Sequence, residues 1–215
     1  MLEIEIGAHR FLVLPQRALY WPAHNWLLIA DLHLGKADTF RHFGIAVPQA
    51  VQWSDLARLG ALLAQWQPQR CVVLGDFVHG RIVQASTAQA WNALVARHPQ
   101  TQFELLAGNH DRALQADVFK LHAVRADCQI GGVWLTHEPV PQAQLLAAQC
   151  LNIHGHIHPA MRLPGSGAKL PALVYHRPYL RMPAFSEFTA GVAAHGPSDS
   201  VWMFAPDAST VVRVR

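Results

Sequence analysis

Five short segments of the chain combine residue types that bind metal ions, and each directly follows an apolar stretch. A lone histidine among the 14 in this sequence is more often an ordinary surface or core side chain than a ligand. Five such segments, all at the ends of apolar stretches, favour one shared site instead. In chain order they are Asp31-Leu-His33, Gly75-Asp76, Gly108-Asn109-His110-Asp111, His137 and Gly155-His156-Ile-His158.

The spacing and chemistry of these residues favour a transition-metal centre. In an extended backbone, side chains two residues apart project from one face, so Asp31 and His33 are expected to reach the same centre, as are His156 and His158. Imidazole nitrogens combined with carboxylate and amide oxygens, with no thiolate, suit Mn²⁺, Fe²⁺ or Zn²⁺ better than Ca²⁺. The glycines within the segments either permit close backbone approach or are ordinary turn residues.

The hydrophobic pattern predicts the elements that must position these segments. The predicted buried strands are 26–30, 71–74, 103–107, 133–136 and 151–153. Between the first three strands, apolar residues at steps of three or four indicate amphipathic helices over 48–66 and 86–98. Alternation of strand and helix predicts a largely parallel sheet, with the candidate ligands in loops beyond the carboxyl ends of its strands.

Beyond about Asp111 the helical pattern fades, and the second half is expected to be mostly β-structure. Gly131-Gly132 indicates a hairpin turn between two strands, and residues 200–214 indicate a closing hairpin. Residues 158–171 contain three prolines and two glycines, and they indicate a surface loop.

Length and charge limit the class of protein. With 215 residues, of which 51% are hydrophobic, the chain is expected to form a single domain over residues 1–215. Lys and Arg number 17 against 14 Asp and Glu, giving a net charge of +3. Because the basic residues are scattered, the sequence shows no footprint of a dedicated nucleic-acid binder.

The cysteines and the N-terminal residues bear on the cellular compartment. Three cysteines without a CxxC spacing argue against a disulfide framework and favour a reducing compartment. The first residues carry Glu3 and Glu5 where a signal peptide needs positive charge, and no apolar run is long enough to span a membrane. A cytoplasmic location with no membrane partner is therefore expected.

Taken in order, the five segments resemble the pattern of the calcineurin-like metallophosphoesterases, D-x-H, G-D, G-N-H-[D/E], H and G-H-x-H. The resemblance implies an α/β fold built as a four-layer α/β/β/α sandwich of two mixed sheets. It also implies two divalent transition metals as cofactors, with Mn preferred over Fe or Zn. By resemblance, one ion is held by Asp31, His33, Asp76 and His158 and the other by Asp76, Asn109, His137 and His156, so that Asp76 bridges them.

Additional motifs resemble those of the small bacterial ligase-associated metallophosphoesterases. The genes of that subfamily lie beside DNA-repair genes, which implies a functional link to DNA ligase and helicase repair proteins as partners. The motifs are residues 30–36, Phe40-Arg41 with Gly44 and Pro48, Gly108 to Arg112, Pro183-Ala-Phe185 and Phe188-Thr189.

The family resemblance further implies a phosphodiesterase in which a hydroxide that bridges the two ions attacks a phosphate-ester substrate. It gives His110 the role of contacting the scissile phosphate and protonating the leaving group. Asp111 either orients His110 or caps the following turn. Lys36, Arg41 and Arg112 either contact outer phosphate oxygens or are solvated surface cations.

Three alternative functions are weighed against this one. A nuclease that processes DNA ends fits the repair context, although no basic aromatic patch marks a nucleic-acid interface, so direct nucleic-acid binding stays open. A lipid-precursor pyrophosphohydrolase of the same superfamily resembles the segment around Asp31 but usually lacks the histidine found here at His110. A non-catalytic metal-binding scaffold is disfavoured, because all eight metal and catalytic positions of the pattern are retained.

Overall fold

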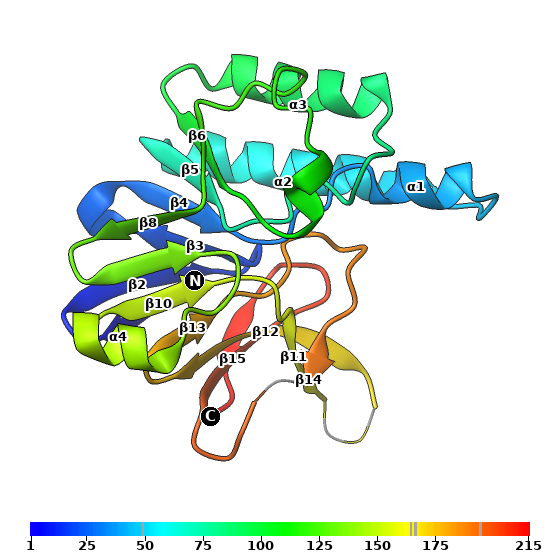
Figure 1. Cartoon of the computed structure of the whole chain (residues 1–215). Helices are drawn as coiled ribbons and strands as arrows, with labels where there is room; N and C mark the ends of the chain where they lie inside the picture. Colours follow the sequence, from blue (N-terminus) through cyan, green and yellow to red (C-terminus); the bar gives the residue numbers. More distant parts are fainter. Residues whose placement is uncertain (49, 164, 166, 194) are drawn as a thin grey trace.

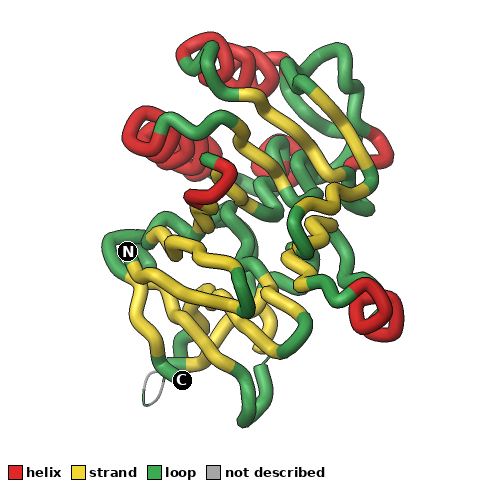
Figure 2. The backbone as a smooth tube through the Cα atoms, turned by 90° about the vertical axis from the view of Figure 1, so that its left-hand side faces the viewer, coloured by secondary structure: helices red, strands yellow, loops and turns green. Residues whose placement is uncertain are grey.

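The computed structural model describes residues 1–48, 50–163, 165, 167–193 and 195–215. Over these residues the chain forms two mixed β-sheets that pack face to face, with helices on their outer sides (Figure 1). Figure 2, turned by 90°, shows the helices at the periphery and the strands between them. This is the predicted α/β/β/α sandwich, although among the described residues its fourth layer is only the short helix α4.

The first half of the chain forms the first sheet, whose strands are arranged in the order of the sequence. β1 to β4 are antiparallel neighbours, whereas β4 to β7 are parallel. Parallel strands bring their carboxyl ends to one edge, and candidate ligands follow β4, β5 and β6 there. The elements are β1 (Leu2–Ile6), β2 (His9–Leu14), β3 (Ala18–Trp21), the 3-10 helix η1 (Pro22–His24), β4 (Trp26–Ile29), β5 (Arg70–Val73), β6 (Gln102–Leu106) and β7 (Ala123–Arg125).

Helices connect the parallel strands and cover the outer face of the first sheet. The connection from β4 to β5 includes α1 (Lys36–His42) and α2 (Ala50–Trp66), and α3 (Ala85–Arg97) connects β5 to β6. Leu59 and Leu63 of α2 are fully buried against the sheet, because a step of four keeps them on one side of the helix. Figure 1 shows α2 and α3 above the sheet and α1 projecting away from the body.

The second half of the chain forms the other sheet, which contains both antiparallel and parallel pairs. Its strands follow the order β14-β11-β12-β13-β10-β9-β8, with β15 paired to β12 and β16 paired to β15. The helix α4 (Gln142–Ala148) connects the parallel strands β9 and β10 on the outer side. The strands are β8 (Asp127–Ile130), β9 (Val133–Thr136), β10 (Leu151–His154), β11 (Pro159–Arg162), β12 (Lys169–His176), β13 (Tyr179–Arg181), β14 (Val192–Ala193), β15 (Ser200–Phe204) and β16 (Val211–Arg213).

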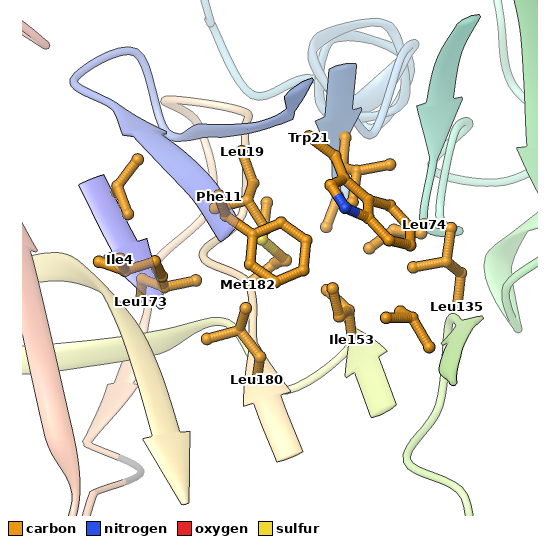
Figure 3. Packing of buried hydrophobic residues seen from close by; sticks show 14 of the residues in the cluster. Ile4, Phe11, Leu19, Trp21, Leu74, Leu135, Ile153, Leu173, Leu180 and Met182 are labelled. Atoms are coloured by element: carbon orange, nitrogen blue, oxygen red, sulfur yellow. The ribbon is translucent and has the colours of Figure 1, made fainter. Parts of the chain in front are cut away.

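The main hydrophobic core lies between the two sheets (Figure 3). Phe11, Leu19 and Trp21 of the first sheet face Ile153 and Leu180 of the second, and all five side chains are almost completely buried. Because this core joins the sheets, it also fixes the loops at the edge of one sheet relative to those of the other.

β4 has two buried faces, which explains its uninterrupted apolar sequence. Trp26 and Leu28 point into the core between the sheets, whereas Leu27 and Ile29 pack under the helices. The strand is thereby held from both sides immediately before the first candidate ligands.

Most of the predicted elements around the site are confirmed. The five predicted strands correspond to β4, β5, β6, β9 and β10, and the two predicted helices to α2 and α3, with small differences in bounds. Gly131-Gly132 forms the turn between β8 and β9, and β15 and β16 pair as the closing hairpin. Residue 49, within the predicted helix 48–66, lies outside the described residues.

The predicted surface loop over 158–171 is wrong in part, because residues 159–162 form β11 and pair with β12. Pro159 opens β11, a position where a strand tolerates the missing N–H. The short elements β1, β2, β3, α1 and α4 were not predicted, although β1 (Leu2–Ile6) does alternate between apolar and charged residues. None of the described helices is both long and apolar enough to cross a lipid bilayer.

Phe11 tests the contribution of the core between the sheets. Its side chain is 0% exposed, so Phe11→Ala is expected to lower the free energy of unfolding, measured by urea denaturation, by about 3–5 kcal/mol through lost apolar burial and a residual cavity. Phe43, which is 70% exposed, is the matched control, and Phe43→Ala should change this free energy by less than about 0.5 kcal/mol. Equal losses in both variants would contradict the assigned core.

Candidate metal centre

The loops that follow β4 and β5 run side by side and carry the first candidate ligands. The N–H of Asp31 donates to the carbonyl oxygen of Gly75 at 3.1 Å, and the N–H of His33 donates to the carbonyl oxygen of Asp76 at 2.8 Å. These backbone hydrogen bonds fix the first two ligand segments against each other, although about 40 residues separate them in sequence.

The candidate ligands do not have the extended backbone that the sequence analysis assumed. Five of them have φ values between 47° and 67°, in the left-handed region that non-glycine residues seldom adopt. Such conformations cost about 1–3 kcal/mol each and persist where the surrounding structure fixes them. The paired residues therefore meet through tight turns, and the prediction from period-two alternation is wrong in its mechanism. These ligands are Asp31, His33, Asp76, His156 and His158.

Four side chains from both halves of the chain form a group suited to a metal ion. Asp31, His33, Asp76 and His158 each offer one ligand atom, and these atoms lie within 4.8 Å of one another. Nε2 of His158 is buried 3.1 Å from an Asp31 carboxylate oxygen, but it has no hydrogen-bond partner among the described residues. A buried imidazole nitrogen without a hydrogen bond, facing carboxylates, fits a divalent cation.

A second group forms around His137. Its Nδ1 lies 3.0 Å from the carbonyl oxygen of Leu74, which can only accept, so Nδ1 carries the proton and Nε2 presents a lone pair. Three other potential metal-ligand atoms surround this Nε2: Oδ1 of Asn109 at 3.0 Å, Nδ1 of His156 at 3.2 Å and Oδ1 of Asp76 at 3.3 Å. Asp76 thus contributes to both groups.

The electrostatic surroundings keep His33 available as a ligand. Burial, reinforced by the nearby charges of Lys36 and His158, lowers the pKa of His33 to about 2. The ring is therefore neutral at physiological pH and retains a nitrogen lone pair for a cation. The same effects, burial first and then Lys36, lower the pKa of the neighbouring His79 to about 4.

Glycines are required where the loops approach one another. A Cβ atom on Gly75 would lie 2.2 Å from the ring of His137, and one on Gly155 would lie 2.7 Å from the carboxylate of Asp31. The close-approach interpretation of these glycines is therefore correct, because a side chain at either position would displace a candidate ligand.

His110 borders the first group without belonging to it. Its Nδ1 lies 3.2 Å from the carbonyl oxygen of His79 and must be the donor, so Nε2 faces the site, 3.9 Å from the carboxylate of Asp76. The side chain is 40% exposed and is therefore accessible to a substrate. The backbone N–H of His110 also donates to Oδ1 of Asp76 at 3.0 Å, which places His110 at a fixed distance from the shared carboxylate.

The carboxylate of Asp111 binds backbone N–H groups and not the imidazole of His110. Its two carboxylate oxygens accept the N–H groups of Val78 at 3.0 Å and Gly108 at 2.8 Å. Burial raises the pKa of Asp111, while these N–H groups act in the opposite direction. No hydrogen bond from the His110 ring to Asp111 is found among the described residues, so Asp111 acts on His110 only through the turn that carries it.

Two of the three predicted phosphate-contacting cations lie at the border of the site. Lys36 opens α1, and its charge acts on His33. Arg112 is exposed and lines a hollow of about 430 Å³ together with Asn109 and His137. Lys36 thus lies beside the first ligand group, and Arg112 lies beside the second.

Arg41 is not brought to the candidate ligands. Its guanidinium pairs with the buried carboxylate of Asp38 and donates to the carbonyl oxygen of Val47 at 3.2 Å. Asp38 in turn accepts from the hydroxyl of Thr87 at 2.7 Å. These contacts join α1 to the start of α3, so Arg41 is engaged in holding the helices together.

His79 lies at the rim of the site, as its position in the sequence after Gly75-Asp76 favours, and it belongs to neither ligand group. Its half-buried ring stacks on that of His110, with centroids 5.2 Å apart, and meets the ring of His33 edge to face at 5.5 Å. Its only signal in the sequence was a position three residues after Asp76, and the pairing of the two loops that brings it inward is a long-range effect.

Known proteins are similar to this chain in sequence and in fold. The family model described as calcineurin-like phosphoesterase matches residues 25–210. No curated protein sequence matches the chain. Among solved structures, the chain is similar to the nuclease MPE of Pseudomonas putida, with 30% identity over 99% of each chain and a TM-score of 0.82. The phosphoesterase YfcE of E. coli shows 14% identity over 88% of this chain and 97% of its own, with a TM-score of 0.46.

The protein is a metal-dependent phosphoesterase. This class follows from the two mixed sheets, the buried group of Asp and His residues at their edge, and the family match. Because the family model covers most of its length, the chain belongs to the calcineurin-like phosphoesterase family. The narrower resemblance to the ligase-associated subfamily stays a prediction.

Asp76→Asn tests the shared carboxylate. Because one anionic donor common to both groups is lost, we expect less than half of the wild-type Mn²⁺ content and a smaller rise in Tm on addition of Mn²⁺. Metal analysis and thermal denaturation measure the two effects, and Asp117→Asn, at an exposed position, serves as the control. Wild-type Mn²⁺ content in Asp76→Asn would contradict the assignment.

Proposed function

We propose that this protein is a phosphodiesterase that uses two divalent transition-metal ions, with Mn²⁺ preferred over Fe²⁺ or Zn²⁺. The observation that carries the proposal is the contribution of Asp76 to both ligand groups. A bound pair of such ions polarises phosphoryl oxygens and lowers the pKa of water. The residues proposed to hold the ions are Asp31, His33, Asp76 and His158 for one, and Asp76, Asn109, His137 and His156 for the other.

His110 is proposed to supply the proton for the leaving group. Nδ1 donates to the carbonyl oxygen of His79, so the ring must be doubly protonated for Nε2 to donate a hydrogen bond to a phosphoryl oxygen or a proton to the departing oxygen. Asp111 is a positioning residue in this proposal, since it binds the backbone of the turn that carries His110.

The surroundings of the site favour a diester over a monoester. A phosphodiester carries two organic groups that extend from phosphorus in different directions. One hollow borders Asn109 and His137, and a second, smaller hollow borders His33 and Lys36. The first hollow, of about 430 Å³, gives one organic group a place beside Arg112. The other group would extend over the surface beside Lys36, because the second hollow, of about 10 Å³, is too small to hold it.

A nucleic acid is the second candidate substrate. The observation that favours it is the 30% identity, over 99% of both chains, to a protein named as a nuclease. The motifs that resemble the ligase-associated subfamily support the same context, in which DNA ligase and helicase repair proteins are functional partners. A cytoplasmic location belongs to this proposal, and the free state of Cys71, Cys128 and Cys150 is compatible with a reducing compartment.

A substrate screen tests the proposed reaction. With Mn²⁺, the protein is expected to hydrolyse bis-nitrophenyl phosphate with a higher kcat/KM than nitrophenyl phosphate, and EDTA should abolish both activities. A single-stranded oligonucleotide, assayed alongside, tests the nucleic-acid candidate. Failure to hydrolyse any of the three by a protein that retains bound Mn²⁺ would favour the scaffold alternative.

The leaving group separates the role of His110 from that of the metal ligands. An oligonucleotide needs a proton on its departing alkoxide, so His110→Ala is expected to lower kcat on it by about 100-fold or more, with Mn²⁺ content retained. The loss on bis-nitrophenyl phosphate should be much smaller, because nitrophenolate departs without a proton. His42→Ala, at an exposed position on α1, is the control. Unchanged cleavage of the oligonucleotide, or equal losses on both substrates, would remove His110 from this role.

A further inference from the structure

The segment 183–189, between β13 and β14, lies directly against the ligand loop that follows β4. The N–H of Phe185 donates to the carbonyl oxygen of Ala30 at 2.7 Å, and the N–H of Ser186 donates to that of Asp31 at 3.4 Å. A segment from the second half of the chain is therefore attached to the backbone of a candidate metal ligand.

A largely buried cluster of charged residues, formed by Arg17, Asp55 and Arg58, holds this segment in place. The carboxylate of Asp55 accepts the N–H of Glu187 at 3.1 Å. Arg58 pairs with Asp55 and with Glu187, donates to the carbonyl oxygen of Phe185, and covers the ring of Phe185 at 4.4 Å. Arg17 donates to the carbonyl oxygen of Ser186 at 3.3 Å. The position of the residues that follow is thereby fixed, and the charge of Glu187 is neutralised.

The fixed segment presents an aromatic ring and a cation beside the site. The ring of Phe40 packs edge to face on that of Phe188 at 5.3 Å. The ammonium group of Lys36 lies 5.6 Å from the centre of the Phe188 ring and donates to the hydroxyl of Thr189 at 3.1 Å. Phe40 is in turn parallel to His79, at 6.5 Å. A continuous wall of rings therefore runs from His79, beside His110, to Phe188.

Phe188 lies between two hollows. The smaller one is shared with His33 and Lys36 at the first ligand group. The larger one, of about 510 Å³, is lined by Phe188, Thr189 and the exposed Lys169 among others. Because Phe188 borders both hollows, a strand that extended over the surface from the first ligand group towards Lys169 would pass its half-buried ring.

From this arrangement we infer that Phe188 forms a subsite for a nucleotide next to the scissile phosphodiester, with its base on the ring and its far phosphate at Lys169, while Lys36 lies beside the scissile phosphodiester. The inference rests on the proposed phosphodiesterase function and narrows its substrate to a nucleic-acid strand. Aromatic rings accept the π-face of any base, and ammonium groups neutralise phosphates, so the subsite is tolerant of base sequence. Phe188 is a specificity-determining residue in this inference and has no part in the chemical step.

The test compares two strands that have the same phosphates and differ only in their bases. One is oligothymidylate, and the other is a strand of abasic tetrahydrofuran nucleotides of equal length. With Mn²⁺, the wild type is expected to have a KM for oligothymidylate that is about tenfold below that for the abasic strand. Phe188→Leu should raise the KM for oligothymidylate by about tenfold and leave the KM for the abasic strand unchanged, so that the preference disappears.

Two further variants separate stacking from structure. Phe188→Tyr retains the ring and should keep the preference. Phe43→Leu replaces an exposed ring at the end of α1 and should behave as the wild type. If Phe188 only stabilises the fold, Phe188→Leu will lower kcat on both strands and keep the preference, which would overturn the inference.

The outcomes also distinguish the inference from the proposed function. Hydrolysis of bis-nitrophenyl phosphate without cleavage of oligothymidylate would overturn the nucleotide subsite and leave the phosphodiesterase intact. If the wild type cleaved oligothymidylate and the abasic strand with equal KM, the nucleotide subsite would likewise be overturned and the phosphodiesterase function would stand. Absence of Mn²⁺-dependent hydrolysis on every diester would overturn the proposed function, and the subsite would be lost with it.

Discussion

The structure depends on the packing of two sheets around one buried carboxylate, that of Asp76. It follows a strand of the first sheet, accepts the N–H of His110, and lies 3.3 Å from Nε2 of His137, which follows a strand of the second sheet. The large core between the sheets holds these groups in register, and Gly75 leaves the space that the ring of His137 fills. A shift of one sheet against the other would separate the carboxylate of Asp76 from the ring of His137.

The site is locally unfavourable, and the rest of the fold compensates for it. Three features of the site oppose folding: the left-handed backbone at five candidate ligands, the buried carboxyl groups, and a buried His158 nitrogen that has no hydrogen bond within the described part of the chain. They are tolerated because the strands before them are buried on both faces and the loops are tied together by backbone hydrogen bonds. A bound cation would relieve part of this cost, so that metal affinity and stability are linked.

The sequence indicated several residues that the structure brings together at the candidate site, but it did not indicate their geometry. Asp31, His33 and Asp76 were found from residue type and position after apolar stretches, and β4 and β5 from their apolar runs. The left-handed turns at these residues were not predictable, because they are imposed by loops about 40 residues apart. Short elements such as β11 and α4, and the attachment of residues 183–189 by Asp55 and Arg58, likewise depend on partners distant in sequence.

The division of the ligands between the sheets has a consequence for synthesis on the ribosome. The first half of the chain carries Asp31, His33, Asp76 and Asn109, and the remaining imidazoles arrive only with β9 and β10. An emerging chain that has completed the first sheet still lacks the candidate ligands His137, His156 and His158. Neither half carries all of the candidate ligands, so a site that requires them all would form only late in translation, when the second sheet docks on the first.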